Sequence, residues 1–305
     1  MTLVAGVDGG QSSTTAVIMN ERGDILGRGA AGPSDYIDEP ETSRRCADAC
    51  EAAVTQALLA GAFGAEGHLD AVVVGLSGFE DTLHGVAPRF TTERTRFVHD
   101  APIALAGAIT SRPAVVVIAG TGSIAYGEDV NGAAVQVGGY GYLFGDEGSG
   151  FAVARAALAH AMELADRGLP SRLGDAALPC FNVPDLRALA RAFYSRKIAR
   201  PDIAGFARVV FDAARLGDPD ANALVEDAAR ALASLASVAI ERMGLMHAPV
   251  PVAFTGGVAA NLDVRARIVA HLSALPVRAT VVDAQADPAV GAARLALADT
   301  GVALR

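Results

Sequence analysis

Short apolar runs that alternate with turns rich in glycine and polar residues dominate the first half of the chain. Residues 4–7, 16–19 and 25–29 are three such runs, and their spacing predicts an antiparallel meander. Residues 115–119, 124–127 and 134–137 repeat this pattern, which suggests a duplicated domain. Further apolar runs predict strands at residues 71–76, 96–98, 250–254 and 277–282.

Apolar positions with helical spacing follow most of these strands. They predict helices at residues 41–61, 101–109, 151–167, 185–194, 204–215, 221–243, 262–272 and 288–299, so that residues 183–245 are largely helical. In residues 221–243 the stripe formed by Leu224, Ala228, Leu232, Leu235 and Met243 indicates packing against a core rather than a cofactor site. We find no low-complexity linker, and Pro113 is the best candidate for a domain boundary.

Composition limits the classes of function. The chain has 305 residues, enough for two domains at roughly 100–200 residues each. Hydrophobic residues make up 51% of the chain, so a large core is expected. The net charge of −9, without any basic run, argues against nucleic acid and anionic membranes as main partners. A phosphate ligand stays compatible, because glycine backbones and Mg²⁺ hold phosphates without many lysines.

The cysteines and the N-terminus point to an intracellular protein. Cys46, Cys50 and Cys180 show no C-x-x-C spacing, and we expect reduced core thiols rather than a metal site. The first residues lack the basic and apolar regions of a secretory signal. No uninterrupted apolar run approaches 18 residues, so no membrane-spanning helix is predicted. A cytoplasmic location is the expectation.

The tip of the first predicted hairpin is the strongest candidate site. Asp8, Gly9 and Gly10 turn the chain after the first strand, and an amide and hydroxyls follow at Gln11, Ser12, Ser13 and Thr14. Glycine lets a bulky anion approach exposed backbone N–H groups, and a carboxylate at a strand end suits Mg²⁺. The pattern is equally compatible with a phosphate and Mg²⁺ site and with an ordinary glycine-rich hairpin turn. It matches neither a P-loop nor a dinucleotide fingerprint.

Three later segments resemble ligand-binding loops at strand ends. Residues 120–123 form a second turn with bare backbone and hydroxyls. Residues 138–150 are the densest glycine run and carry Asp146, Glu147 and Ser149, of which the serine is a candidate cap for the next helix. Residues 255–258 place two glycines at a strand end before a helix, where a flat group can lie against the backbone.

Asp100 stands between a predicted strand and a predicted helix whose first turn contains Pro102. A carboxylate is electrostatically favoured at a helix N-terminus, so Asp100 is a candidate functional residue, and a simple helix N-cap is the alternative. The neighbouring His99 is expected to be an ordinary loop histidine.

Five of these elements occur in the order of the actin, hexokinase and Hsp70 ATPase superfamily. They are the sequences DGGQSSTT, HDA, GTGS, TGGV and DPAVGAARLAL. Within that superfamily, LSGFE, HDAPIALAGA, IAGTGSIAYG and GYGYLFGDEGSGF resemble the family that joins N-acetylglucosamine kinases to the ATPase activators of benzoyl-CoA reductase and hydroxyacyl-CoA dehydratases. The resemblance covers most of the chain.

The resemblance implies an α/β fold of two actin-like (ribonuclease H-like) domains. Each would be a mixed five-stranded sheet flanked by helices, with ATP in the cleft between them. The N-terminal domain would span residues 1–113 plus the closing helix at about 288–305. The C-terminal domain, with a helical insertion, would span residues 114–287.

The same resemblance assigns roles to residues of an ATP-dependent amino-sugar kinase. Asp100 would be the catalytic base, and Asp8 would orient hydrated Mg²⁺. ATP phosphates would be bound by Gly9, Gly10, Gln11, Ser12, Ser13, Thr14, Gly120, Thr121, Gly122 and Ser123. Adenosine would lie on Gly256, Gly257 and Asn261. The sugar would contact Asp35, Ser77, Asp100, Gly120 and Asp146, whereas Glu147 would hold its loop.

Two departures from the resembled kinases leave the sugar open. Those kinases usually carry Asn where Asp35 stands, and some carry a polar residue where Ile124 stands. A carboxylate at position 35 accepts sugar hydroxyls but also suits a free 2-amino group. N-acetylglucosamine, glucosamine and a muramic-type sugar are therefore all candidates. The 6-OH is the usual acceptor in these kinases, and many of them are homodimers.

Two other functions compete with the kinase. An activator ATPase would hold a [4Fe–4S] cluster between two subunits through paired cysteines, but no cysteine lies between Cys50 and Cys180, where ligands would be expected. A non-catalytic sugar sensor would keep the pocket but would leave Asp100 without a role. A repressor version of that sensor would want a DNA-binding module, and none precedes the first strand.

Overall fold

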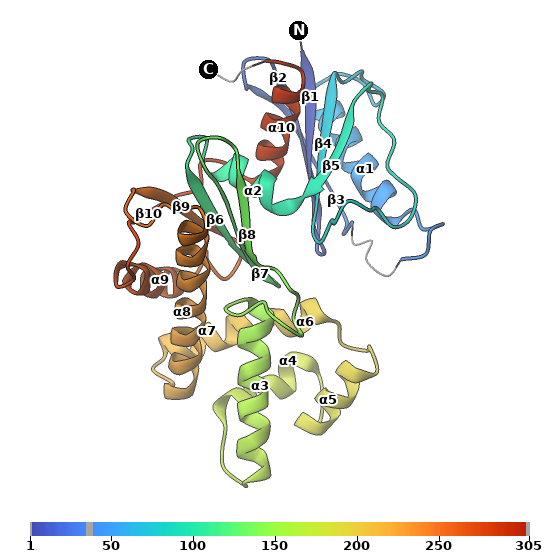
Figure 1. The fold of residues 1–305 in the computed structure, drawn as a ribbon. Coiled ribbons are helices and arrows are strands. Elements are labelled where there is room, and N and C mark those ends of the chain that lie inside the picture. The colour runs from blue at the N-terminus through green and yellow to red at the C-terminus, as the bar shows by residue number, and fades with distance from the viewer. Residues whose placement is uncertain (1, 35–38, 303–305) are drawn as a thin grey trace. The chain divides into compact units, whose positions relative to one another are not determined.

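The computed structural model describes residues 2–34 and 39–302 (Figure 1). Their contacts divide the chain into two compact units. Unit 1 contains the chain up to Ser111 together with the residues from Asp283 onward, and unit 2 is Arg112–Val282. The chain therefore leaves unit 1 once and returns to it once.

Unit 1 is built on a five-stranded sheet with the strand order β3-β2-β1-β4-β5. Its strands are β1 (Leu3–Gly9), β2 (Thr14–Asn20), β3 (Ile25–Ala31), β4 (Ala71–Leu76) and β5 (Thr95–His99). β1, β2 and β3 form the predicted antiparallel meander, whereas β4 runs parallel to both β1 and β5. Because β1 and β4 are parallel neighbours, their carboxyl ends reach the same edge of the sheet.

Helices cover both faces of this sheet. They are α1 (Arg45–Ala60), α2 (Asp100–Ala108) and α10 (Pro288–Asp299). Successive strand residues point to opposite faces, so Val7 and Val74 join the core beneath α1, and Val4 and Val73 join the core beneath α10 (Figure 1). Gly6 lets α10 approach closely, since a Cβ there would lie 2.0 Å from a backbone nitrogen of that helix.

Unit 2 repeats the arrangement, with the strand order β10-β9-β6-β7-β8. Its strands are β6 (Ala114–Ala119), β7 (Ser123–Glu128), β8 (Ala134–Gly138), β9 (Val250–Thr255) and β10 (Ala279–Val282). β6, β7 and β8 are the second antiparallel meander, and β9 is parallel to β6 and β10. The expected fold class, two mixed five-stranded sheets flanked by helices, is confirmed.

Seven helices of the described residues belong to unit 2. They are α3 (Gly150–Asp166), α4 (Arg172–Phe181), α5 (Leu186–Tyr194), α6 (Arg200–Gly205), α7 (Ala207–Arg215), α8 (Pro219–Arg242) and α9 (Leu262–Ser273). The helix predicted at residues 204–215 starts later than expected, because Phe206 separates α6, which ends at Gly205, from α7. The helix α4 was not predicted, and Cys180 near its end is exposed, so that cysteine is not the expected core thiol.

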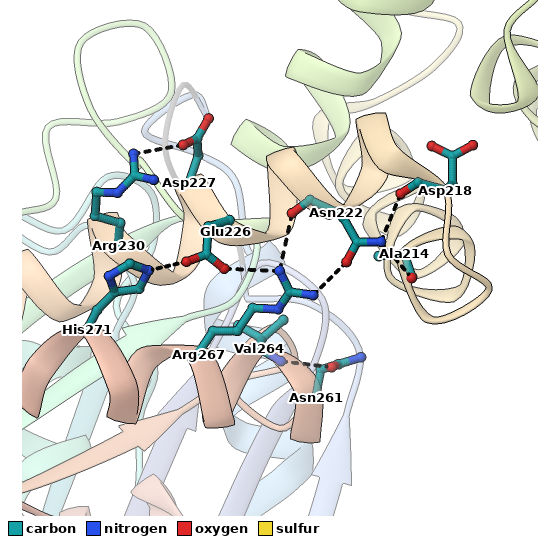
Figure 2. A network of polar contacts seen from close by, with 10 residues as sticks. All are labelled: Ala214, Asp218, Asn222, Glu226, Asp227, Arg230, Asn261, Val264, Arg267 and His271. Atoms are coloured by element: carbon teal, nitrogen blue, oxygen red, sulfur yellow. Dashed lines mark hydrogen bonds and ion pairs between the residues drawn. The ribbon is translucent and has the colours of Figure 1, made fainter.

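A polar network joins α8 to α9 (Figure 2). Arg267 of α9 donates to Glu226 Oε2 at 3.0 Å and to Asn222 Oδ1 at 2.6 Å, both on α8. His271 Nε2 lies 2.7 Å from the other oxygen of Glu226. The hydrogen bond from Arg267 is the main reason that the pKa of Glu226 is lowered. The network fixes α9, whose first residues follow the predicted adenosine turn.

Among the residues that the structure describes, no helix has both the length and the apolar character needed to cross a membrane.

Candidate functional site

The first phosphate turn connects β1 to β2 and begins where Gly9 pairs with Thr14. The Gly10 N–H donates to the Ser13 carbonyl oxygen at 3.0 Å and closes the turn. Gly9 has no room for a side chain, since a Cβ there would lie 2.5 Å from the side chains of both Leu76 and Ser34. Ser12 and Ser13 are exposed at the tip, so their hydroxyl groups are available to an anion.

Thr14 has a different environment from the two serines. Its side chain is buried, and Oγ1 donates to the Gly32 carbonyl oxygen at 2.8 Å. The Ser34 N–H donates to the Gly10 carbonyl oxygen at 3.1 Å. The Thr14 hydroxyl therefore fastens the segment after β3 to the turn, and only its backbone could serve a phosphate. Asp35, which follows Ser34, lies outside the described residues.

Three carboxylates of unit 1 act on one another electrostatically. Asp8, near the end of β1, is half-buried, and its pKa is raised to about 7, mainly by burial and then by the charges of Asp100 and Asp287. Asp287 also caps α10, because its Oδ1 accepts the Val290 N–H at 3.0 Å. A cation beside Asp8 would restore its ionised form, so the arrangement fits the predicted Mg²⁺ role.

Asp100 is the first residue of α2, directly after β5, as the sequence predicts for a helix N-terminus. The N-cap, however, is His99, whose Nδ1 accepts the Ala101 N–H at 3.1 Å. His99 is therefore the last residue of β5 and a helix cap rather than the expected loop histidine. Histidine is not among the residues preferred at N-caps, so this role could not be predicted from the sequence.

His99 also contacts the predicted catalytic base. Its Nδ1 lies 2.8 Å from Asp100 Oδ1. Burial lowers the pKa of His99, but a hydrogen bond from protonated Nδ1 to Asp100 and the charges of Asp100 and Glu80 outweigh it and raise the pKa overall. Protonated Nδ1 cannot also accept the Ala101 N–H, so the helix cap and this hydrogen bond belong to different protonation states of the imidazole. The Asp100 side chain is 23% exposed, so this carboxylate is still accessible to a substrate.

Ser77 lies directly after β4, at the same edge of the sheet as Asp8 and Gly9. Its N–H donates to the Gly9 carbonyl oxygen at 3.1 Å. Asp8, the first phosphate turn, Ser77 and Asp100 therefore come together at the carboxyl ends of β1, β4 and β5. In open α/β sheets ligands bind outside these strand ends.

The second phosphate turn connects β6 to β7 in unit 2. The Gly120 N–H donates to the Gly122 carbonyl oxygen at 3.0 Å, and the Ser123 hydroxyl donates to the Glu147 carbonyl oxygen at 2.8 Å. The Ser123 N–H is bonded to Asp146 Oδ1 at 3.2 Å. Within the part of the chain that the structure describes, no hydrogen bond uses the N–H groups of Thr121 and Gly122, and these two remain available to a phosphate.

Asp146 is only 5% exposed, and both of its oxygens are engaged by the protein. Oδ1 accepts the Ser123 N–H, and Oδ2 accepts Arg200 Nη2 at 2.6 Å. Burial raises the pKa of Asp146, while the bonds from Ser123 and Arg200 oppose that rise. A direct sugar contact by Asp146 stays a prediction, and it requires a hydroxyl to reach a carboxylate that is already bonded twice.

The loop that carries Asp146 is fixed to the second phosphate turn at several points. The Gly150 N–H donates to the Gly120 carbonyl oxygen at 2.8 Å, and the Phe151 N–H donates to the Thr121 carbonyl oxygen at 3.3 Å. Ser149 caps α3 as predicted, with its Oγ accepting the Ala152 N–H at 3.1 Å. The turn and the start of α3 therefore form one rigid element.

The predicted adenosine turn lies against the same strand end. The Val258 N–H donates to the Ala119 carbonyl oxygen at 3.0 Å. Gly256 and Gly257 are exposed, and Gly257 has open space where a Cβ would stand. Asn261 caps α9, with Oδ1 accepting the N–H groups of Asp263 and Val264. Figure 2 shows the bond to Val264. Only the amide nitrogen of Asn261 is left for adenosine.

Asp287 and Arg200 lie beside predicted site residues but were not identified from the sequence. Asp287 precedes Pro288, and an aspartate before a proline is a recognisable helix start, so this cap could have been found. Arg200 is 54 positions from Asp146, and no local pattern connects the two residues.

Comparison with known proteins places the chain in a family. The model of the BadF/BadG/BcrA/BcrD ATPase family matches residues 5–296. A curated N-acetylmuramic acid/N-acetylglucosamine kinase of Clostridium acetobutylicum is 28% identical over 277 residues, which are 86% of this chain and 87% of that protein. An N-acetyl-D-glucosamine kinase of Dictyostelium discoideum is 27% identical, with 96% of this chain and 97% of that protein covered.

A solved structure agrees with these relatives. The crystal structure of a protein from Chromobacterium violaceum, provisionally named an N-acetylglucosamine kinase, has a TM-score of 0.79 and 26% identity. The match covers 97% of this chain and 99% of that one. Since the family model also spans nearly the whole chain, the protein belongs to the BadF/BadG/BcrA/BcrD ATPase family.

Proposed function

We propose that this protein is an ATP-dependent amino-sugar kinase. It would transfer the γ-phosphate of ATP to a hydroxyl of an amino sugar, with N-acetylglucosamine as the leading substrate and the 6-OH as the expected acceptor. Two curated relatives that match nearly their whole length carry the names of such kinases. A muramic-type sugar also stays a candidate, because one of these relatives is named for both sugars.

The observation that carries this function is the position of Asp100. It opens α2 at the carboxyl end of β5, close enough to Asp8 for the two charges to interact, and its side chain is partly exposed. A partly exposed carboxylate next to a phosphate turn has the position required of a base that receives the proton of an attacking hydroxyl. A sensor that only binds sugar would not need it.

In this mechanism Asp100 accepts a hydrogen bond from the sugar hydroxyl and aligns its oxygen with the γ-phosphate. The proton passes to Asp100 as the new P–O bond forms. Capping of α2 by His99 holds the Asp100 backbone, and the nearby imidazole limits the rotation of its carboxylate. Positioning of this kind accounts for much of the catalysis in phosphoryl transfer.

Mg²⁺ is expected to accompany the ATP phosphates, and Asp8 is the residue that would hold it through water. The raised pKa of Asp8, caused by burial and by two neighbouring carboxylates, fits a position that a cation occupies. When bound, such an ion neutralises charge that develops on the phosphates.

The nucleotide residues fall into two sets, one in each unit. In unit 1 the exposed serines Ser12 and Ser13 and the backbone of the first turn would bind phosphate oxygens. In unit 2 the N–H groups of Thr121 and Gly122 would do so, and Gly256 and Gly257 would offer a flat surface to adenosine.

A coupled ADP-release assay tests the function directly. The assay uses MgATP with N-acetylglucosamine, glucosamine, N-acetylmuramic acid, N-acetylmannosamine and glucose in turn. Strong turnover that depends on one sugar would establish the kinase and identify its substrate. Slow ATP hydrolysis that is the same with every sugar would contradict it. Omission of Mg²⁺, with EDTA present, should abolish sugar-dependent turnover.

The activator ATPase is the competing function, and the cysteines argue against it. Cluster ligation needs thiolates, but no cysteine lies between Cys50 and Cys180, and Cys46 and Cys50 are buried in the core of unit 1. A visible spectrum and iron content after anaerobic purification would reveal a cluster.

We further propose that the protein is a homodimer and that it is located in the cytoplasm. Light scattering would test the oligomeric state.

A further inference from the structure

Arg200 and Asp146 form the most enclosed of the ion pairs found in the described part of the chain. Nη2 of Arg200 lies 2.6 Å from Oδ2 of Asp146, and their side chains are 22% and 5% exposed. The guanidinium also lies over two rings, 5.0 Å from the centre of Tyr142 and 5.7 Å from that of Phe151. Arg200 begins α6, whereas the other three residues belong to the glycine-rich loop and the start of α3.

The Arg200–Asp146 ion pair contacts the second phosphate turn through Asp146. Asp146 Oδ1 accepts the Ser123 N–H, and a Cβ added to Gly122 would lie 2.8 Å from Asp146 Oδ2. The negative charge of Asp146 therefore stands next to the backbone that has to accept phosphate oxygens. Unless a positive charge compensates it, the Asp146 carboxylate would strongly repel a phosphate bound to this backbone, because the carboxylate is nearly shielded from water.

We propose that Arg200 is a positioning residue of the phosphate site: it neutralises Asp146 and so allows the second phosphate turn to bind the phosphates of a nucleotide. This inference rests on the proposed kinase function and adds to it a residue that lies outside the recognised motifs. Arg200 would act through Asp146 and the Ser123 backbone rather than by touching the nucleotide.

The geometry of the pair suits a task of this kind better than a purely stabilising one. The Nε atom of Arg200 is buried and has no hydrogen-bond partner among the described residues, which costs stability. Buried ion pairs often contribute little net stability, but removing one partner leaves an uncompensated charge. The rings of Tyr142 and Phe151, which stand at 70° to each other, hold the guanidinium through cation–π contacts, and lysine cannot reproduce that arrangement.

The test measures binding of MgADP by calorimetry in the absence of sugar, so that any role of Asp146 in sugar binding does not enter. Arg200→Met should weaken binding about tenfold or more, because it exposes the phosphates to the full charge of Asp146. Arg187→Met is the matched control, since Arg187 pairs with Asp166 in a largely exposed ion pair of the same unit. It should bind like the wild type.

The double variant Arg200→Met/Asp146→Asn distinguishes neutralisation from simple structural damage. If Arg200 acts by neutralising Asp146, the double variant should bind MgADP within about twofold of Asp146→Asn alone. Arg200→Lys should bind MgADP more tightly than Arg200→Met but less tightly than the wild type, because lysine restores the positive charge but not the contacts with the two rings. Melting temperatures of all variants establish that they fold.

Two results would overturn the inference. One is wild-type affinity in a folded Arg200→Met variant. The other is a double variant that binds about tenfold more weakly than Asp146→Asn, since Arg200 would then matter without its charged partner. If Arg200→Met alone does not fold, the comparison of the double variant with Asp146→Asn still tests the inference. Failure of the wild type to bind nucleotide at all would instead overturn the proposed kinase.

Discussion

Gly256 lies so close to Ala119 that a β-carbon on the glycine would stand 2.5 Å from the Ala119 carbonyl oxygen. Its φ of +94° is also a conformation that residues with side chains rarely adopt. This contact folds the adenosine turn against the end of β6, where the second phosphate turn begins. This glycine therefore helps to set the mutual position of the two predicted nucleotide turns of unit 2, together with the hydrogen bond from the Val258 N–H to the Ala119 carbonyl oxygen.

Replacing this glycine should damage both stability and nucleotide binding. We expect Gly256→Ala to lower the free energy of unfolding by about 1–3 kcal/mol, because the backbone strain and the clash cannot both be relieved. We also expect weaker MgADP binding, since the adenosine turn would move away from β6. Urea denaturation and calorimetry measure the two effects.

Gly257→Ala is the control for that variant. An added Cβ at Gly257 meets no atom within 4 Å, and its φ is not in the positive region. Its stability should stay within about 0.5 kcal/mol of the wild type, as for exposed substitutions in general. Equal losses of stability in the two variants would show that the contact with Ala119 is not the cause.

The polar network between α8 and α9 makes a second prediction. Arg267→Ala removes the bonds to Glu226 and Asn222 that Figure 2 shows, and we expect a loss of about 1–2 kcal/mol in the free energy of unfolding. Arg230→Ala is the matched control, because its pair with Asp227 lies on α8 alone and is well exposed. Such pairs contribute about 0–1 kcal/mol. Equal effects would mean that the network does not stabilise the packing of α9.

Much of the fold could be predicted because local patterns determine its elements. β4 occupies the residues predicted from a single apolar run, and both meanders follow from glycine-rich turns between apolar segments. The helix α4 escaped prediction because Gly174 and Pro179 lie inside it, and both residues weaken a helical signal. Gly205 ends α6, but a single glycine inside a helical pattern is often tolerated, so the predicted helix ran through the break before α7.

The residues of the candidate site also fall into those that could be predicted from the sequence and those that could not. The glycine-rich turns at the strand ends could be predicted because their glycines and hydroxyls are contiguous in sequence, and their nucleotide roles stay predictions. Residues that contact these turns from distant parts of the sequence could not be predicted. The ion pair of Arg200 with Asp146 depends on how the helices pack on the second sheet, and the charge of Asp287 acts on Asp8 only because α10 returns to the first sheet.

Sugar preference gives a third prediction, which rests on the sequence. A carboxylate at position 35 suits a free, protonated 2-amino group, so Asp35→Asn should lower the ratio of kcat/KM for glucosamine to that for N-acetylglucosamine. A charge–charge contact of about 1 kcal/mol corresponds to about a fivefold change in this ratio. Competition assays with both sugars measure it directly. An unchanged ratio would show that Asp35 does not select the sugar.

The final prediction concerns Asp100, the proposed base. Asp100→Asn keeps the size of the side chain and removes its ability to take a proton, so turnover should fall about 10²–10⁴-fold. Because an aspartate near a helix N-terminus contributes only about 0.3–1 kcal/mol, the variant should still fold. MgADP binding should stay near that of the wild type, which separates loss of chemistry from loss of structure. A fall in kcat with little change in the KM for ATP is the expected signature of a group that acts in the transition state. Near-normal turnover in this variant would remove Asp100 from the chemistry, and another group near the first phosphate turn would then have to receive the proton.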